Sequence, residues 1–147
     1  SSALVKRYVA ETGTAWVLEI TRPGTGHTLL IARITWVEML SALARRQREG
    51  SLTAAQVDQA AQSFRYDLDM QYQVVELTQE LTEVAGRLVR NYPLRAYDAI
   101  QLAAALRIQR DLLQAHTMSL VFVCADDRLL AIAQAEGLPT DNPNRYL

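Results

Sequence analysis

Three short apolar runs constrain what this chain can fold into, because each is followed by a longer stretch with helical character. They are Thr28–Ile34, Gln73–Leu77 and Leu120–Cys124. Short apolar runs bounded by loops are typical of buried strands. Strands that alternate with helices indicate an α/β fold in which helices cover both faces of a parallel sheet. Since three strands are few for such a sheet, we expect a further strand before Ser1.

Helices are expected around these strands, and several of their ends carry recognisable signals. Thr53, with Gln56 three residues later, matches a capping box, and Gly50 is well placed to end the preceding helix. The expected helices are Ser1–Val9, Ala15–Ile20, Thr35–Glu49, Thr53–Asp69, Thr78–Asn91, Ala96–Ala115 and Asp127–Glu136. The tail Pro139–Leu147 has room for an edge strand. No repeat or linker divides residues 1–147, so a single domain is expected.

The composition excludes several classes of protein. Half of the residues are apolar, 21% are charged and the net charge is −1, which is typical of a globular domain without an overall basic field. The single cysteine, Cys124, excludes a disulfide framework and a zinc site built mainly from thiolates. No apolar run reaches the roughly 18 residues of a membrane-spanning helix, and no signal peptide opens the chain. No membrane association is therefore expected.

Arginine supplies almost all of the positive charge, because Lys6 is the only lysine. Arg45, Arg46 and Arg48 form the densest cluster. Arginine suits bidentate contacts with phosphate. A codon bias and a solvated helix face explain the same pattern without any ligand, so both interpretations stay open.

Acidic residues occur where a parallel α/β sheet builds its sites, at the carboxyl ends of strands. Glu38 follows the first expected strand and lies in the first turn of the next helix. Asp126 and Asp127 follow the run that ends at Cys124. Each has an alternative structural role: Glu38 could complete a capping box with Thr35, and an aspartate could cap the following helix.

Asp98 is a more unusual acid. At 3.6 residues per turn it shares a helix face with the apolar Leu94, Leu102 and Ala105. A carboxylate on an apolar stripe is costly unless a cation or hydrogen bonds satisfy it. A favourable interaction with the helix dipole is the alternative explanation.

Together these acids favour metal-dependent chemistry on a phosphodiester. Close carboxylates repel one another, and a hard cation such as Mg²⁺ or Mn²⁺ relieves that repulsion through oxygen ligands. Two such ions can clamp an in-line phosphoryl displacement. The motifs of other chemistries, including the GxSxG elbow, the Walker A loop and the GxGxxG fingerprint, are absent.

Four segments, in this order and spacing, resemble the motifs of the PIN-domain ribonucleases, and most closely the VapC-type toxins. The opening Ser1–Lys6 resembles the segment after the family's first catalytic aspartate. The segments that resemble its second, third and fourth acidic motifs are Thr35–Leu43 (TWVEMLSAL), Leu94–Ala103 (LRAYDAIQLA) and Phe122–Leu129 (FVCADDRL). Gly137–Pro139 and Asn142–Pro143 resemble the family's usual ending, so the similarity covers nearly the whole chain.

The resemblance implies a three-layer α/β/α sandwich with a central parallel sheet, a Mg²⁺ or Mn²⁺ cofactor and cleavage of RNA. It also implies a homodimer and a VapB-like antitoxin that covers the acidic pocket. Glu38, Asp98 and Asp126 are implied to be catalytic and to bind the metal, with Asp127 and Ser2 as auxiliary residues. An RNA substrate and the absence of a signal peptide predict a cytoplasmic protein.

The sequence departs from the family pattern at two places. The first acid of the family would stand immediately before Ser1, so we expect it upstream together with its strand. Cys124 stands where relatives often carry serine or threonine, and a thiol is a weaker hydrogen-bonding group. The missing first acid leaves an alternative function open, a non-catalytic PIN-like module that binds a partner protein or RNA.

Overall fold

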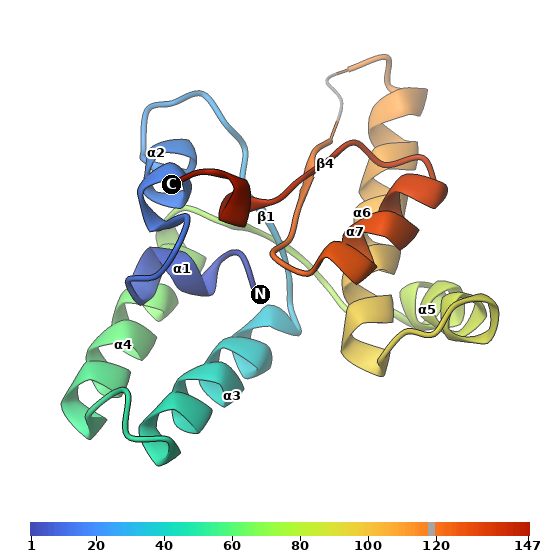
Figure 1. The fold of residues 1–147 in the computed structure, drawn as a ribbon. Helices are drawn as coiled ribbons and strands as arrows, with labels where there is room; N and C mark the ends of the chain where they lie inside the picture. Colours follow the sequence, from blue (N-terminus) through green and yellow to red (C-terminus); the bar gives the residue numbers. More distant parts are fainter. Residues whose placement is uncertain (118–119) are drawn as a thin grey trace. The chain divides into compact units, whose positions relative to one another are not determined.

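The computed structural model describes residues 1–117 and 120–147, and the chain divides into two compact units (Figure 1). Unit 1 comprises Ser1–Val75 and Pro143–Leu147, and unit 2 comprises Glu76–Asn142. Each unit contains one pair of parallel strands and its own helices.

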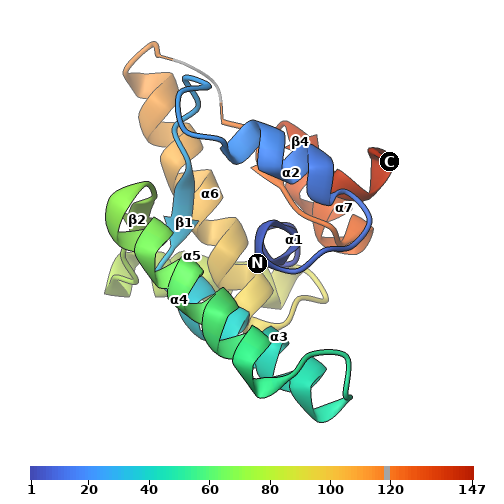
Figure 2. The same cartoon turned by 90° about the vertical axis from the view of Figure 1, so that its left-hand side faces the viewer.

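Unit 1 is a helical unit built around one short parallel strand pair. Its elements are α1 (Val5–Tyr8), α2 (Thr14–Thr21), β1 (Leu30–Ala32), α3 (Thr35–Arg48), α4 (Ala54–Met70), β2 (Gln73–Val75) and the 3-10 helix η1 (Pro143–Arg145). Leu30 pairs with Gln73 and Ala32 with Val75. Figure 1 shows α3 and α4 joined at one end by a short loop, and both α3 and α1 pack against α4 (Figure 2). The connection from β1 to β2 therefore consists of two packed helices.

The core of unit 1 lies between α1, α3 and α4. Met39, Leu43 and Phe64 have no exposed surface. Met39 and Leu43 lie one helical turn apart on α3, which is the spacing that places side chains on one face. Phe64 of α4 stacks against Trp36 and meets Tyr8 edge-on. The buried face of α3 is thus fixed by aromatic packing against α4.

Unit 2 combines a helix pair with a second short parallel strand pair. Its elements are α5 (Gln79–Asn91), α6 (Ala96–Gln114), β3 (Phe122–Val123), α7 (Asp127–Ala135) and β4 (Thr140–Asp141). Val123 pairs with Asp141, and α7 packs on β4. The extensive packing of α5 against α6 is explained by the alanines of α6, because small side chains let two helices approach closely.

The helices and strands confirm the expected α/β class with parallel strand pairing. All three expected strands occur, but each is shorter than its apolar run: β1, β2 and β3 contain three, three and two residues. The edge strand considered for the tail is present as β4, which pairs with β3. The helix expected over Ser1–Val9 is wrong in extent, because only Val5–Tyr8 is helical. The single domain and a strand before Ser1 stay predictions.

The capping box predicted at the start of α4 is confirmed. Thr53 Oγ1 accepts a hydrogen bond from the Gln56 amide at 3.2 Å, and Gln56 Oε1 accepts one from the Thr53 amide at 2.8 Å. Both bonds satisfy backbone donors that a helix start leaves without partners.

None of the helices in the described part of the chain is long and apolar enough to cross a membrane.

Two glycines of unit 1 provide a matched test of the packing around η1. Gly13 and Gly50 both have positive φ, +86° and +78°. A Cβ on Gly13 would lie 2.3 Å from the Pro143 carbonyl oxygen, whereas a Cβ on Gly50 would meet nothing within 4 Å. Gly50→Ala should therefore lower the free energy of unfolding by about 1–2 kcal/mol, which is the strain of an alanine in the left-handed conformation. Gly13→Ala should cost about 1–3 kcal/mol more, as overpacking does.

Urea denaturation of both variants checks this prediction. Equal losses of stability in Gly13→Ala and Gly50→Ala would contradict the close approach of Pro143 to Gly13.

Candidate active site

Glu38 lies in the first turn of α3, shortly after β1 ends, as the sequence predicts. Its side chain is half-buried. The alternative role for Glu38, a capping box with Thr35, is wrong, because that role requires the helix to begin after Thr35 and it begins one residue earlier. The N-cap residue is Ile34, no side chain caps this helix start, and Thr35 is already helical and only 2% exposed.

Asp126 is the N-cap of α7, so the capping role considered for it is confirmed. Its Oδ1 accepts a hydrogen bond from the Arg128 amide at 2.9 Å. Burial opposes ionisation of this carboxyl, but the hydrogen bond and the positive charge of Arg128, together with the Leu129 amide, outweigh it and lower the pKa of Asp126. A cap leaves the remaining lone pairs of a carboxylate available, so capping and ligation are compatible roles.

Asp127 is held by a residue that the sequence did not single out as a site residue. Asn142 follows β4, is only 2% exposed, and its Nδ2 donates to Asp127 Oδ1 at 2.8 Å. The Asn142 amide donates to Asp141 Oδ1, also at 2.8 Å. The parallel pairing of β3 with β4 explains the contact, because residues that follow parallel strands lie at the same edge of the sheet.

Cys124 also lies at this strand end. It is buried, and its Sγ accepts a hydrogen bond from the Asp126 amide at 3.3 Å. The thiol thus occupies the position where a hydroxyl would make a stronger bond.

Asp98 lies in the first turn of α6 and is half-buried. The apolar face predicted around it is real: Leu102 has no exposed surface and Ala105 is 9% exposed. Asp98 is not the cap of α6, because the N-cap is Arg95 and no side chain caps this end.

The candidate residues are divided between the two units. Ser2 and Glu38 belong to unit 1, and Asp98, Asp126 and Asp127 belong to unit 2. Within residues 1–117 and 120–147, no group of three or more His, Cys, Asp or Glu side chains is arranged to hold a metal ion. The chemistry of the candidates nevertheless fits a hard divalent cation, because all of them offer oxygen and none offers sulfur or imidazole.

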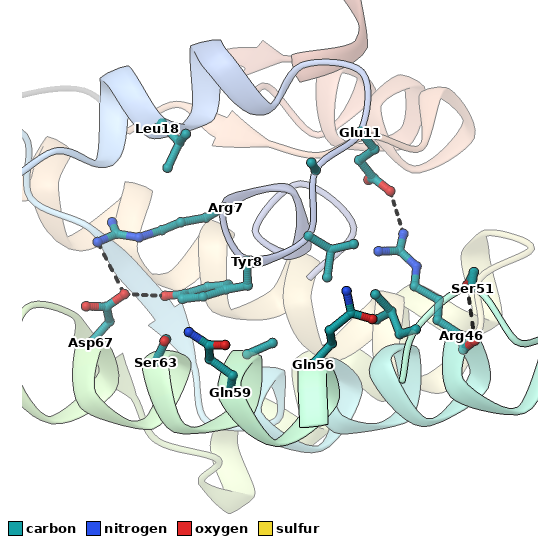
Figure 3. Close-up of a pocket in the computed structure, with 14 residues that line it drawn as sticks. Arg7, Tyr8, Glu11, Leu18, Arg46, Ser51, Gln56, Gln59, Ser63 and Asp67 are labelled. Carbon is teal, nitrogen blue, oxygen red and sulfur yellow. Dashed lines mark hydrogen bonds and ion pairs between the residues drawn. The ribbon is translucent and has the colours of Figure 1, made fainter. Parts of the chain in front are cut away.

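A separate cavity of about 750 Å³ opens in unit 1 between α1, α2 and α4 (Figure 3). Its two acids, Glu11 and Asp67, already face cations. Lys6 Nζ lies 2.9 Å from Glu11 Oε1, Arg46 pairs with the other Glu11 oxygen, and Arg7 Nη2 lies 3.2 Å from Asp67 Oδ2. This cavity is therefore not a second cation site.

The polar network beside this cavity was missed from the sequence. The Tyr8 hydroxyl bonds both Asp67 Oδ2 and the Tyr72 hydroxyl at 2.6 Å, so it connects α1 to the last turn of α4 and to the residue before β2. Lys6 is only 5% exposed and also donates to the Thr12 carbonyl at 2.8 Å. That Lys6 is the only lysine was the one feature of the sequence that pointed to this network. The partners of Tyr8 lie 59 and 64 positions away, beyond the reach of pattern analysis.

Comparison with known proteins gives consistent matches. The profile of the PIN domain family matches residues 1–135. Ribonuclease VapC45 of Mycobacterium tuberculosis (strain CDC 1551 / Oshkosh) is 32% identical over 108 residues, which are 74% of this chain and 73% of that protein. Ribonuclease VapC49 of Mycobacterium tuberculosis (strain ATCC 25618 / H37Rv) matches with the same identity and coverage. No solved structure gives a significant match.

The Tyr8 network predicts a loss of stability in alkali. Burial raises the pKa of Tyr72 to about 12, although its bond with Tyr8 and the charge of Arg7 oppose the shift. Burial and the bond to Asp67 raise the pKa of Tyr8 further above the ordinary value. Above about pH 10 the unfolded chain releases these protons while the folded chain keeps them, so the free energy of unfolding should fall as the pH rises.

Urea unfolding between about pH 9 and about pH 12 measures this loss. Tyr8→Phe should be less stable at neutral pH, because it loses two hydrogen bonds, but its stability should fall less steeply in alkali. Tyr66→Phe, at a tyrosine that is 64% exposed, should behave like the wild type. Identical alkaline slopes in Tyr8→Phe and the wild type would contradict the shifted pKa of Tyr8.

Proposed function

Because the chain belongs to the PIN domain family, in its VapC-type branch, we propose that it is a metal-dependent endoribonuclease and the toxin of a toxin–antitoxin pair. One structural observation carries the proposal furthest. Glu38, Asp98 and Asp126 each stand at the start of a helix, and two of these helices directly follow strands. Helix starts after parallel strands are the usual location of phosphate and metal chemistry in α/β folds.

Glu38, Asp98 and Asp126 are the residues that would hold Mg²⁺ or Mn²⁺. Such an ion, when bound, supplies Lewis acidity and a more acidic water for attack on a phosphodiester. Asp127 would act as an auxiliary acid, and Ser2 would shape the pocket or bind a water molecule of the metal.

The surroundings of these residues support their roles. The Arg128 amide fixes Asp126 and favours its ionised form, which is the form that binds a cation. Asn142 fixes one oxygen of Asp127. Oriented, ionised carboxylates lose less entropy when they bind a metal than freely rotating ones.

The partners follow from the same proposal. The substrate is RNA, and a cognate VapB-like antitoxin inhibits the enzyme by covering its acidic residues. We further propose a homodimer and a cytoplasmic location, where RNA and antitoxin are both present.

Cleavage of total cellular RNA by the full-length protein tests the proposed activity. With Mg²⁺ or Mn²⁺ we expect discrete fragments, and with a chelator none. Asp98→Asn should abolish cleavage without unfolding the protein, because it replaces an anionic metal ligand by a neutral group of the same shape. Circular dichroism of the variant checks that α6 and the rest of the fold persist.

Asp111→Asn is the matched control on the same helix. Asp111 is exposed and, within residues 1–117 and 120–147, forms ion pairs only with Arg107 and Arg110, so this variant should cleave RNA like the wild type. Full activity of Asp98→Asn, or cleavage that persists in chelator, would contradict the proposed site.

A further inference from the structure

Arg45 and Arg48 differ from the neighbouring basic residue of α3. Both are exposed, and neither forms an ion pair within the described ranges. Arg46, which stands between them, is half-buried and pairs with Glu11. Two arginines at the end of α3 are thus available to an external anion, and the third is not.

The helical geometry places Arg45 in line with Glu38. At about 100° per residue, a residue seven positions after Glu38 returns to within about 20° of the same direction. The rise between them is about 10 Å. Ser41 and Ala42 lie on this face between Glu38 and Arg45, and both are too small to block an approach to it. Arg48 follows Arg45 after three residues and lies on the adjoining face.

The buried face of α3 points elsewhere. Met39 and Leu43 have no exposed surface and lie about 100–140° around the helix from Glu38. Arg46 lies on that side, about 80° from Glu38, which explains why it is half-buried and pairs within unit 1. The Glu38–Arg45 face is therefore separate from the face that packs against α4.

Two structural explanations for the arginines are insufficient. Cations in the last turn of a helix interact favourably with its dipole, and Arg45 and Arg48 do so. That interaction requires only a position near the helix end and not an alignment with Glu38. Glu49, one turn beyond Arg45, could neutralise it, but the described part of the chain shows no ion pair between them.

We propose that Arg45, assisted by Arg48, binds phosphates of the RNA strand a few nucleotides away from the bond that is cleaved. The inference rests on the proposed function, because it assumes that the scissile phosphate lies at Glu38, at one end of the Glu38–Arg45 face. Phosphates follow one another by about 3.4 Å along the axis of a stacked strand. An arginine about 10 Å from Glu38 along α3 therefore reaches a phosphate a few nucleotides away. The planar guanidinium matches two phosphate oxygens, and Ser41 leaves space for the strand between the two residues.

RNA binding in the presence of a chelator tests this inference separately from cleavage. Fluorescence anisotropy with a labelled single-stranded RNA gives Kd for the full-length protein at several salt concentrations. Arg45→Ala should raise Kd roughly fivefold at low salt, the scale of one exposed charge pair. It should also reduce the slope of log K against log salt by about 0.7, the value for one phosphate contact on a single strand.

Matched variants separate a specific contact from a change of net charge or stability. Arg87→Ala removes an exposed arginine of α5 and should leave Kd within twofold, about the error of such a comparison. Arg45→Lys should keep most of the salt slope, since it keeps the charge. The thermal midpoint of each variant should stay near that of the wild type, because an exposed helix-end charge contributes little to stability.

The outcomes distinguish this inference from the proposed function. An unchanged Kd in Arg45→Ala, or an equal loss in Arg87→Ala, would overturn the phosphate contact even if the wild type cleaves RNA. RNA binding that depends on Arg45, in a wild-type protein that cleaves no RNA with either metal, would support the contact and overturn the nuclease.

Discussion

The start of a helix directly after a strand is the constraint on which the candidate site depends. β1 leads into α3 with Glu38 in its first turn, and β3 leads into α7 with Asp126 as its cap. A helix start exposes backbone amides and a partial positive charge, so it stabilises an ionised carboxylate placed there. Burial opposes ionisation of Asp126, but hydrogen bonds from the Arg128 and Leu129 amides at this helix start, together with the charge of Arg128, lower its pKa. Chemistry that requires several ionised acids is therefore compatible with this fold.

Buried charges in unit 1 follow a different rule, since they are neutralised by one another. Lys6 and Arg46 both pair with Glu11, and Arg7 pairs with Asp67. A buried charge is tolerated only when it is paired and hydrogen-bonded. These pairs connect α1 with α3 and α4, so they hold the start of the chain against the helix that carries Glu38. They also leave Arg45 and Arg48 as the arginines of α3 that face outward.

The sequence predicted local features well because their causes are local. The capping box at Thr53 and Gln56 needs only residues within one turn, and it occurs as expected. The apolar runs located β1, β2 and β3, but not their ends, since hydrophobicity continues beyond the residues that pair. Thr35 shows the same limit: it resembles a cap in sequence, but the helix already includes it and its side chain is buried.

Features with distant partners could not be predicted in this way. The bond between Asn142 and Asp127 requires the parallel register of β3 and β4, which short strands do not reveal. The Tyr8–Asp67 bond joins residues 59 positions apart, and neither residue belongs to a motif. The surroundings of Asp98 could be predicted, because an acid on an apolar helix face is visible in the sequence itself. The structure confirms that face.

The proposed function requires that Glu38, Asp98 and Asp126 bind the same divalent ion. Mn²⁺ titration of the full-length ¹⁵N-labelled protein measures this binding, because the paramagnetic ion broadens amide signals near its site. Signals around Glu38, Asp98 and Asp126 should broaden together at the same low Mn²⁺ concentration. Glu38→Gln or Asp98→Asn alone should weaken the broadening at all three positions. Broadening at only one of the three residues, or broadening unaffected by either substitution, would contradict binding of one ion by all three.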